Sequence, residues 1–366
     1  MNYRAEQTKK IVAVIAAAGF GWGVLWSGTQ GIKLAFQSTG QLSQTQTASV
    51  RLATTPAETT VSPNQSTPAV SFNSSATILI GGDLMFDRKI RLFGQTSSYE
   101  SLLAPLLPLF HSADLVIANL EGPITSQPSQ TLRPDKTTTK SLTFTFAPIV
   151  AKALAKSGVT AVSLANNHTD NFGSKGLIET RKFLQAAEVG YFGSPWNATT
   201  TDLVISRNGI RIALVGYHAF HEGFEQILEN IRQHKADGDF VIVMPHWGVE
   251  YATTSSAQQR SQARALVSAG ADAVIGSHPH VVMDHEWIGQ VPVFYSLGNL
   301  LFDQYFSPEV MKGNLVKLHL TRNQNGTGLE SLEVYQTSTA SKKNVTVTDQ
   351  PIYTEKPGSL GQTRRE

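Results

Sequence analysis

The stretch Val274-Ile-Gly-Ser-His-Pro-His280 runs from an apolar, strand-like segment directly into two histidines that are separated by one residue. Two imidazoles just past the end of a buried strand can point from a tight loop into one crevice, where neutral ring nitrogens bind divalent metals well. Short His-x-His matches also arise by chance, and His278 and His280 are equally compatible with loop residues that form backbone hydrogen bonds. The interpretation therefore depends on which other residues of the chain end at the same place.

The same pattern, a short apolar run that ends in polar residues, recurs at five other places. The runs are Ile78 to Ile80 before Asp83, Leu115 to Ala118 before Glu121, Val162 to Leu164 before Asn166-Asn-His168, Val241 to Met244 before His246, and Val293 to Tyr295 before Asn299. Each run is typical of a buried strand.

Between these runs the hydrophobic spacing is that of amphipathic helices. Phe224, Ile227, Leu228 and Ile231 fall on one helical face, and similar stripes lie within residues 177–187 and 258–269. Strands that alternate with helices predict an α/β fold. In such folds, binding sites gather beyond the carboxyl ends of the strands.

The polar residues at these ends supply the donor atoms of a metal centre. The candidate ligands are Asp83, Glu121, Asn167, His246, His278 and His280. Carboxylate, amide and imidazole donors suit Mn, Fe or Zn better than a calcium cage. A carboxylate can bridge two metals, and two metals can clamp the attacking and leaving oxygens of a phosphate ester. The sequence thus predicts one or two divalent metal ions, without distinguishing Mn, Fe and Zn.

Three further residues are candidates for a catalytic role: His168, Asp170 and Arg88. His168 is placed to protonate a leaving group or to stabilise developing charge. Asp170 either orients His168 or caps the helix that follows. Arg88 either binds a substrate anion or pairs with Asp83 or Glu121 across the site. His218 and His221 follow another strand-like run and are weaker candidates for additional ligands.

Composition and charge exclude several classes of function. The chain has no cysteine, which rules out disulfides, thiolate metal sites and cysteine nucleophiles. A formal net charge of +2 gives no basis for a nucleic-acid partner, which would need a strong basic excess.

The N-terminal residues predict a membrane anchor. Arg4, Lys9 and Lys10 precede the uncharged run from Ile11 to Trp26, and positive residues before an apolar segment favour a cytoplasmic N-terminus. We therefore expect an uncleaved signal anchor at 1–36 and an extracytoplasmic domain. A disordered Ser/Thr-rich linker is expected at 37–75, the folded domain at 76–340 and a flexible tail at 341–366.

Six motifs occur in order within residues 76 to 305. They are Gly82-Asp-Leu-Met-Phe-Asp-Arg88, Asn119-Leu-Glu-Gly-Pro-Ile-Thr125, Ala165-Asn-Asn-His-Thr-Asp-Asn-Phe-Gly173, His246-Trp-Gly-Val-Glu-Tyr251, Gly276-Ser-His-Pro-His280 and Ser296-Leu-Gly-Asn-Leu-Leu-Phe-Asp-Gln304. Together they resemble the successive signatures of the CapA family, poly-γ-glutamate capsule biosynthesis proteins whose domain is similar to calcineurin-like metallophosphoesterases.

The resemblance implies a four-layer α-β-β-α sandwich of the metallophosphoesterase type, with two central sheets and helices outside. It implies that Asp83 and His280 serve a first metal, that Glu121 bridges, that Asn167, His246 and His278 serve a second metal, and that His168 is the acid or transition-state residue. Two positions depart from the phosphoesterase pattern. Met85 replaces the histidine of an Asp-x-His motif, and Glu121 replaces a bridging aspartate.

Two functions of different class remain open at this point. One is a membrane-anchored component for synthesis or export of poly-γ-glutamate or a related anionic surface polymer, working beside other export or synthesis proteins. The other is a metal-dependent hydrolase that cleaves a phosphoester or a polymer with metal-activated water. The segment from Ser126 to Lys140, with three cationic residues, either binds an anionic polymer or is a solvated loop.

Overall fold

The computed structural model describes residues 74–133, 135–197 and 201–358. The anchor predicted at 1–36 lies outside these residues, as does the linker predicted at 37–75, except for Ser74 and Ser75, where the first strand begins. Within the described ranges, no helix combines the length and the apolar character needed to cross a membrane.

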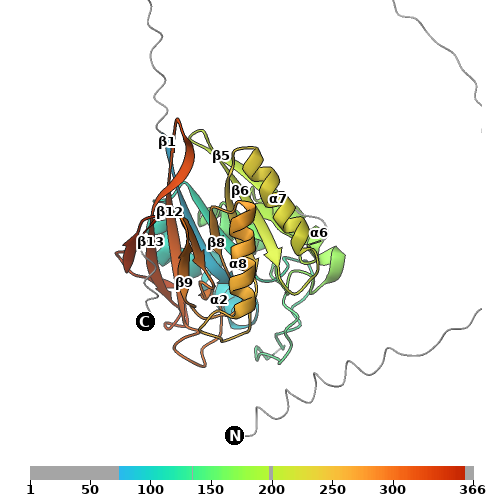
Figure 1. Ribbon diagram of the computed structural model, residues 1–366. Coiled ribbons are helices and arrows are strands. Elements are labelled where there is room, and N and C mark those ends of the chain that lie inside the picture. Colours follow the sequence, from blue (N-terminus) through green and yellow to red (C-terminus); the bar gives the residue numbers. More distant parts are fainter. Residues whose placement is uncertain (1–73, 134, 198–200, 359–366) are drawn as a thin grey trace, which may run out of the picture. The chain divides into compact units, whose positions relative to one another are not determined.

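The first sheet is built around β1 (Ser74–Leu84) and has nine strands in the described part of the chain (Figure 1). The others are β2 (Leu115–Leu120), β3 (Ala161–Ser163), β4 (Gly190–Phe192), β11 (Asn299–Leu301), β12 (Lys312–Asn323), β13 (Gly326–Ser338), β14 (Thr346–Val347) and β15 (Tyr353–Glu355). Strands β1 to β4 and β11 pair in parallel, whereas β12 pairs antiparallel with β1 and extends the sheet through β13.

The second sheet has six described strands in the order β5-β6-β7-β8-β10-β9. They are β5 (Leu203–Arg207), β6 (Ile210–His218), β7 (Phe240–His246), β8 (Ala273–Ile275), β9 (His285–Ile288) and β10 (Val291–Phe294). The four central strands are parallel, and the two edge strands are antiparallel to their neighbours.

Helices cover the outer face of each sheet. The first sheet carries α2 (Arg88–Ser97), α3 (Tyr99–Leu103), η1 (Ala104–Leu106), α4 (Leu107–Phe110), α5 (Ile149–Lys156) and α6 (Gly173–Ala186), and the second carries α7 (Phe224–Ala236) and α8 (Ala257–Ala269). The helical stripe predicted from Phe224 onward is confirmed, because Ile227, Leu228 and Ile231 are buried. The stripes predicted at 177–187 and 258–269 correspond to α6 and α8.

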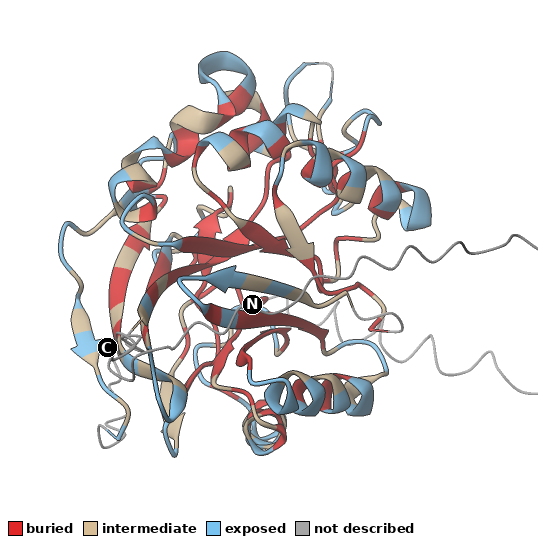
Figure 2. Cartoon of the chain, turned by 90° about the horizontal axis from the view of Figure 1, so that it is seen from above, coloured by how far each residue is buried: buried red, intermediate tan, exposed pale blue. Residues whose placement is uncertain are grey.

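Three buried clusters separate the layers of the fold. Because side chains of a strand alternate between faces, Ile78 and Ile80 of β1 pack toward the second sheet, while Leu79 packs toward the helices. In a third cluster, strands β6, β7 and β8 pack against helices α7 and α8. Figure 2 shows buried strands in the middle and helices outside, so the layers are helix, sheet, sheet and helix.

All six strands predicted from the apolar runs are present, as β1, β2, β3, β7, β8 and β10. The tail was predicted to be flexible from residue 341, but up to residue 358 it is ordered against the first sheet. There β14 and β15 pair antiparallel with β13, and the side chain of Val345 is fully buried. The polar composition of this segment gave no sign of strands, because short edge strands need few apolar residues when a neighbouring strand supplies the hydrogen bonds.

The chain passes from the second sheet to the first between β10 and β11. Strand β11 pairs in parallel with β1, so that Asn299 lies beside Asp83. Gly82 permits this close approach, since a Cβ atom there would lie 1.9 Å from the carbonyl oxygen of Gly298. This crossing brings the ends of both sheets together at the residues that the sequence singled out.

Candidate metal centre

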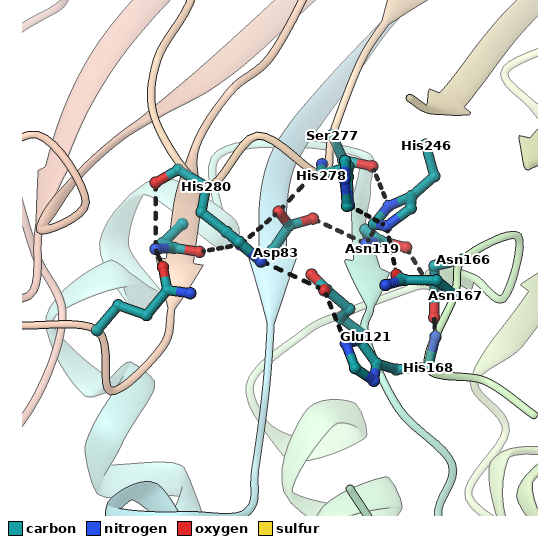
Figure 3. A network of polar contacts seen from close by, with 12 residues as sticks. Asp83, Asn119, Glu121, Asn166, Asn167, His168, His246, Ser277, His278 and His280 are labelled. Atoms are coloured by element: carbon teal, nitrogen blue, oxygen red, sulfur yellow. Dashed lines mark hydrogen bonds and ion pairs between the residues drawn. The ribbon is translucent and has the colours of Figure 1, made fainter. Parts of the chain in front are cut away.

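The six predicted ligands meet where the carboxyl ends of strands from both sheets converge (Figure 3). Asp83, Glu121 and Asn167 follow or end strands of the first sheet, and His246, His278 and His280 follow or end strands of the second. The centre therefore lies between the two sheets, and neither sheet supplies it alone.

Three of these residues form a group with one donor atom each. The donor atoms of Asp83, Glu121 and His280 all lie within 4.8 Å of one another. His280 Nδ1 is 3.3 Å from Asp83 Oδ2, and His280 Nε2 is 3.6 Å from Glu121 Oε1. All three side chains are buried, and we call this group the carboxylate half of the centre.

The charges in the carboxylate half are strongly coupled. Burial raises the pKa of Glu121 well above its usual value, and the nearby Asp83 raises it further. Burial alone would lower the pKa of His280, but the carboxylates of Glu121 and Asp83 outweigh that effect and raise it to about 9. Two acidic groups and one basic group thus share a buried site.

Glu121 provides the test of whether a cation fits this group. Both of its carboxylate oxygens are buried, and neither has a hydrogen-bond partner among the described residues. Its ion-pair contacts are long, 3.6 Å to His280 and 3.9 Å to His168, and a buried carboxylate without hydrogen bonds is costly unless it is well paired or coordinates a metal. Two carboxylates and one imidazole suit a divalent cation once binding displaces the extra proton of His280, so the residues present fit the metal that the sequence predicted.

The other three predicted ligands form a second group, the imidazole half. His246 Nε2 lies 2.8 Å from Asn167 Oδ1 and 3.1 Å from His278 Nδ1. Ligand atoms that share one ion lie about 3 Å apart when metal–nitrogen distances are about 2 Å. Burial lowers the pKa of His278 to about 3 and lowers that of His246 well below its usual value. Both rings are therefore neutral, which is the form that binds metals.

A buried network behind the ligands fixes their orientation. The side-chain amide of Asn119 donates to Asp83 Oδ1 at 2.7 Å, and Asn166 donates to Asn119 Oδ1 at 3.0 Å. Ser277 Oγ lies 3.0 Å from His246 Nδ1 and sets the orientation of that ring. Sequence reasoning quoted these three residues within motifs but gave them no role. Their position at the ends of buried strands was the available signal.

The histidine loop adopts an uncommon backbone conformation. His278 has φ 99° and His280 has φ 60°, both in the region that favours glycine. The same loop donates the backbone N–H of His278 to Asp83 Oδ2 at 3.3 Å. Such conformations persist where the surrounding structure holds them, and they concentrate at functional sites.

His168 lies beside the carboxylate half, as predicted. Its Nε2 is 3.9 Å from Glu121 Oε1, and its Nδ1 is 3.1 Å from Asn171 Oδ1. Burial lowers the pKa of His168 to about 4, so the ring is neutral. Because Asn171 Oδ1 accepts from Nδ1–H, the Nε2 atom that faces Glu121 carries a lone pair.

Asp170 has neither of the roles that were expected for it. Its carboxylate accepts a hydrogen bond from the indole N–H of Trp196 at 3.2 Å, and α6 has no side-chain cap. The next residue, Asn171, is the one that orients His168. The prediction missed this because the turn after Asn167 decides which side chain faces the ring.

Arg88 pairs with Asp303, and not with Asp83 or Glu121. Its guanidinium lies 5.1 Å from the ring centre of Phe144 and 5.4 Å from that of Phe302. Its positive charge nevertheless lowers the pKa of His168, after the larger effect of burial. Arg88 therefore borders the centre without contacting the carboxylate ligands, and its predicted contact with a substrate anion stays a prediction.

His218 lies behind the imidazole half, with its ring centre 5.9 Å from that of His246. Its Nδ1 donates to the carbonyl oxygen of Pro195 at 2.6 Å. Met85 is fully buried, and its sulfur accepts the backbone N–H of Asp87 at 3.0 Å. The residue that replaces the expected histidine is thus part of the core.

Comparison with known families gives a match over residues 77–304, to the family described as "Bacterial capsule synthesis protein PGA_cap". The chain belongs to this family. The match confirms the resemblance to the CapA proteins that the six motifs carry.

Two relatives within the family are similar over most of this chain. The "Capsule biosynthesis protein CapA" of Bacillus anthracis is 29% identical over 75% of this chain and 70% of its own length. The "PGA biosynthesis protein CapA" of Bacillus subtilis (strain 168) is 28% identical over 75% of this chain and 76% of its own length. Among solved structures, the calcineurin-like phosphoesterase YfkN from Bacillus subtilis matches 76% of this chain and 94% of that chain, with 17% identity and a TM-score of 0.42.

Proposed function

We propose that this protein acts in the synthesis or export of an anionic bacterial capsule polymer, poly-γ-glutamate or a related one, and that it does so with a divalent-metal centre. The family and the names of its relatives support the biological setting. One observation carries the metal centre, which is the buried Glu121 carboxylate whose two oxygens lack hydrogen-bond partners in the described part of the protein.

The roles of the residues follow from their positions. Asp83, Glu121 and His280 hold a first cation, and Asn167, His246 and His278 offer donor atoms for a second. When bound, a divalent cation supplies Lewis-acid chemistry and positive charge that attracts a carboxylate or phosphate group. Asn119 and Ser277 keep Asp83 and His246 in place. The cationic Arg88 at the border raises the local concentration of anions.

A second candidate function, hydrolysis at the same centre, is favoured by the position of His168. Asn171 holds the ring by Nδ1, so that Nε2 points at the carboxylate half and is free to accept a proton. In this role His168 takes up a proton from the attacking water, whereas the sequence suggested a donor to the leaving group.

The setting that we propose for this activity is the outer face of the cytoplasmic membrane. Residues 1–36 would anchor the chain, with residues 37–75 as a tether and with other polymer synthesis or export proteins as partners. A protease added outside intact cells should then remove an epitope placed at the C-terminus. Protection of that epitope would contradict the topology.

Metal analysis of the full-length protein, purified without chelator, tests the centre. We expect about one to two metal ions per chain in the wild type, and a loss of at least the first in Glu121→Gln. Wild-type protein that binds neither added Mn²⁺ nor added Zn²⁺ would overturn the metal centre. Turnover of phosphoesters or of poly-γ-glutamate that disappears in His168→Ala, with metal content unchanged, would establish the hydrolase.

A further inference from the structure

A cleft of about 660 Å³ lies beside the metal centre and contains none of its six ligands. Its lining consists of Lys89, Phe93, Asp303, Tyr305, Phe306 and Lys342. Clefts of this size are typical of ligand sites. Two cations and three aromatic rings in one cleft suggest an anionic ligand with an apolar part.

The positive charges of this cleft are available to a ligand. The ammonium groups of Lys89 and Lys342 each lie 5.8 Å from the centre of the same Tyr305 ring. Neither ammonium forms an ion pair with a carboxylate in the part of the chain that the structure describes. The one acidic lining residue, Asp303, is already engaged by Arg88 and by the backbone N–H of Lys89. The cleft thus presents two cations that form no ion pair with a carboxylate of the described residues, and of the two it is Lys89 whose charge also lowers the pKa of Asp303.

Two chains of contacts join the cleft to the metal centre. Asp303 in the cleft pairs with Arg88, whose charge acts on His168 in the centre. On the other side, the exposed ring of Phe306 packs edge-on against Tyr251, which lies 6.3 Å from the ring of His280. A chain molecule with its end at the metal ligands therefore has a cationic cleft within reach.

We propose that this cleft is a second anion subsite, which holds a pendant carboxylate of an acidic polymer while another group of the same chain lies at the metal centre. The inference rests on the function proposed above and names the ligand of the neighbouring site. Lys89 and Lys342 bind the carboxylate, and Tyr305 keeps both ammonium groups over one ring. Phe93 and Phe306 pack against the methylene groups of the polymer.

The sequence placed the two lysines in different predicted regions, Lys89 in the folded domain at 76–340 and Lys342 in the flexible tail at 341–366. The pairing of β14 with β13 and the hydrogen bond from the Val345 N–H to the carbonyl oxygen of Leu102 in α3 hold this segment on the domain, where Lys342 shares the cleft with Lys89 and Phe93 of α2. A flexible, solvent-exposed tail would not hold Lys342 at a fixed position beside the cleft.

Binding of an oligo-γ-glutamate of defined length to the full-length protein tests the subsite. We expect Lys89→Gln and Lys342→Gln each to weaken binding about threefold, and the double variant about tenfold, because exposed ion pairs contribute modestly. Lys343→Gln is the matched control, since Lys343 is exposed, carries the same charge and lies one residue outside the cleft. We expect the control to bind as the wild type does.

The outcomes separate this proposal from the proposed function. A loss in the double variant but not in Lys343→Gln supports the subsite, and an equal loss in both, or in neither, overturns it. Repeating the titration with chelator and with Glu121→Gln shows whether the metal centre takes part. If chelator and Glu121→Gln leave the affinity of the wild type unchanged while the lysine effect persists, the subsite stands and the metal-based function is contradicted. Bound oligo-γ-glutamate can also be competed with tripolyphosphate and with unlabelled oligo-γ-glutamate of equal charge. If tripolyphosphate displaces it at concentrations where unlabelled oligo-γ-glutamate does not, the assignment of a carboxylate ligand is overturned.

Discussion

Asp87 and Glu121 are two fully buried carboxylates that follow neighbouring strands of the first sheet, and their surroundings are opposite. Asp87 accepts hydrogen bonds from the backbone N–H groups of Arg88 and Thr145, at 2.9 and 3.0 Å. It also accepts from Ser129 Oγ at 2.7 Å and pairs with the guanidinium of Arg91 at 3.0 Å. Glu121 has no hydrogen bond at either oxygen within the described residues.

The difference separates a carboxylate that stabilises the fold from one that, in the proposed function, binds a cation. A buried charge with complete partners holds its loops together, and removal of the charge leaves those partners unsatisfied. A buried charge without partners lowers stability until something binds it. Substitution should therefore lower the free energy of unfolding at Asp87 and raise it at Glu121.

The largest effect is expected at Asp87. Asp87→Ala leaves Arg91 buried without its carboxylate partner and removes two oxygens that together accept four hydrogen bonds, so the free energy of unfolding should fall by about 3–5 kcal/mol. Urea denaturation followed by circular dichroism measures the loss. Asp87→Asn, which keeps part of the hydrogen bonding, is the control and should lose less. A loss below about 1 kcal/mol for Asp87→Ala would remove the contrast with Glu121.

Glu121→Gln should change stability in the opposite direction. Without metal, removal of a buried carboxylate that has no hydrogen bond should raise the free energy of unfolding by about 1 kcal/mol or more, because the 3.6 Å pair with His280 offsets only part of its desolvation. With added Mn²⁺ or Zn²⁺ the order should reverse, because only the wild type gains the binding free energy of the metal. Thermal unfolding with chelator and with metal tests both arms. A variant that is destabilised in chelator would contradict our interpretation of Glu121.

A third region, around His218, extends the comparison. Its imidazole ring is buried in the neutral form, whereas the other two groups are carboxylates. Burial lowers the pKa of His218 to about 4, against 6.5 for an unperturbed histidine. As the pH falls below 6.5 the unfolded chain takes up a proton that the folded chain does not, so stability present above pH 6.5 is lost on acidification. The contribution to this loss between pH 7 and pH 5 is about 2 kcal/mol.

His218→Gln removes this titration, so the variant should lose less stability than the wild type over the same pH range. Urea denaturation at several pH values compares the two slopes. Parallel slopes would show that His218 does not dominate acid sensitivity.

The smallest expected effect distinguishes the neighbours Asp170 and Asn171. Asn171→Ala removes the acceptor for His168 Nδ1–H and for the backbone N–H of Phe144, at a cost of about 1 kcal/mol. It should also lower the pKa of His168, since this hydrogen bond opposes the effect of burial. NMR titration of the His168 ring measures the change. Asp170→Ala should leave the titration unchanged, and the reverse result would restore the role predicted for Asp170.

Much of the fold was predictable because local sequence carries strand and helix periodicity. Apolar runs such as Leu115 to Ala118 marked the buried strands, and the stripe from Phe224 to Ile231 marked a helix. The six ligand candidates were predictable for a related reason, since polar residues at the ends of buried strands lie at one edge of a sheet. The short strands after residue 341 were missed, because hydrogen bonds from β13 and not their own composition hold them.

The sequence by itself determined the strands, the helices, the family motifs and the chemical types of the ligands, because these depend on neighbours along the chain. Only the tertiary structure decided that Asn171 and not Asp170 faces His168, that Arg88 pairs with Asp303, and that Lys89 meets Lys342 at Tyr305. It also left Glu121 without a hydrogen bond from the described residues, while it surrounded Asp87 with hydrogen-bond donors. Burial and partner geometry arise from contacts between distant segments, and they decide which carboxylate has its hydrogen bonds satisfied by the protein and which does not.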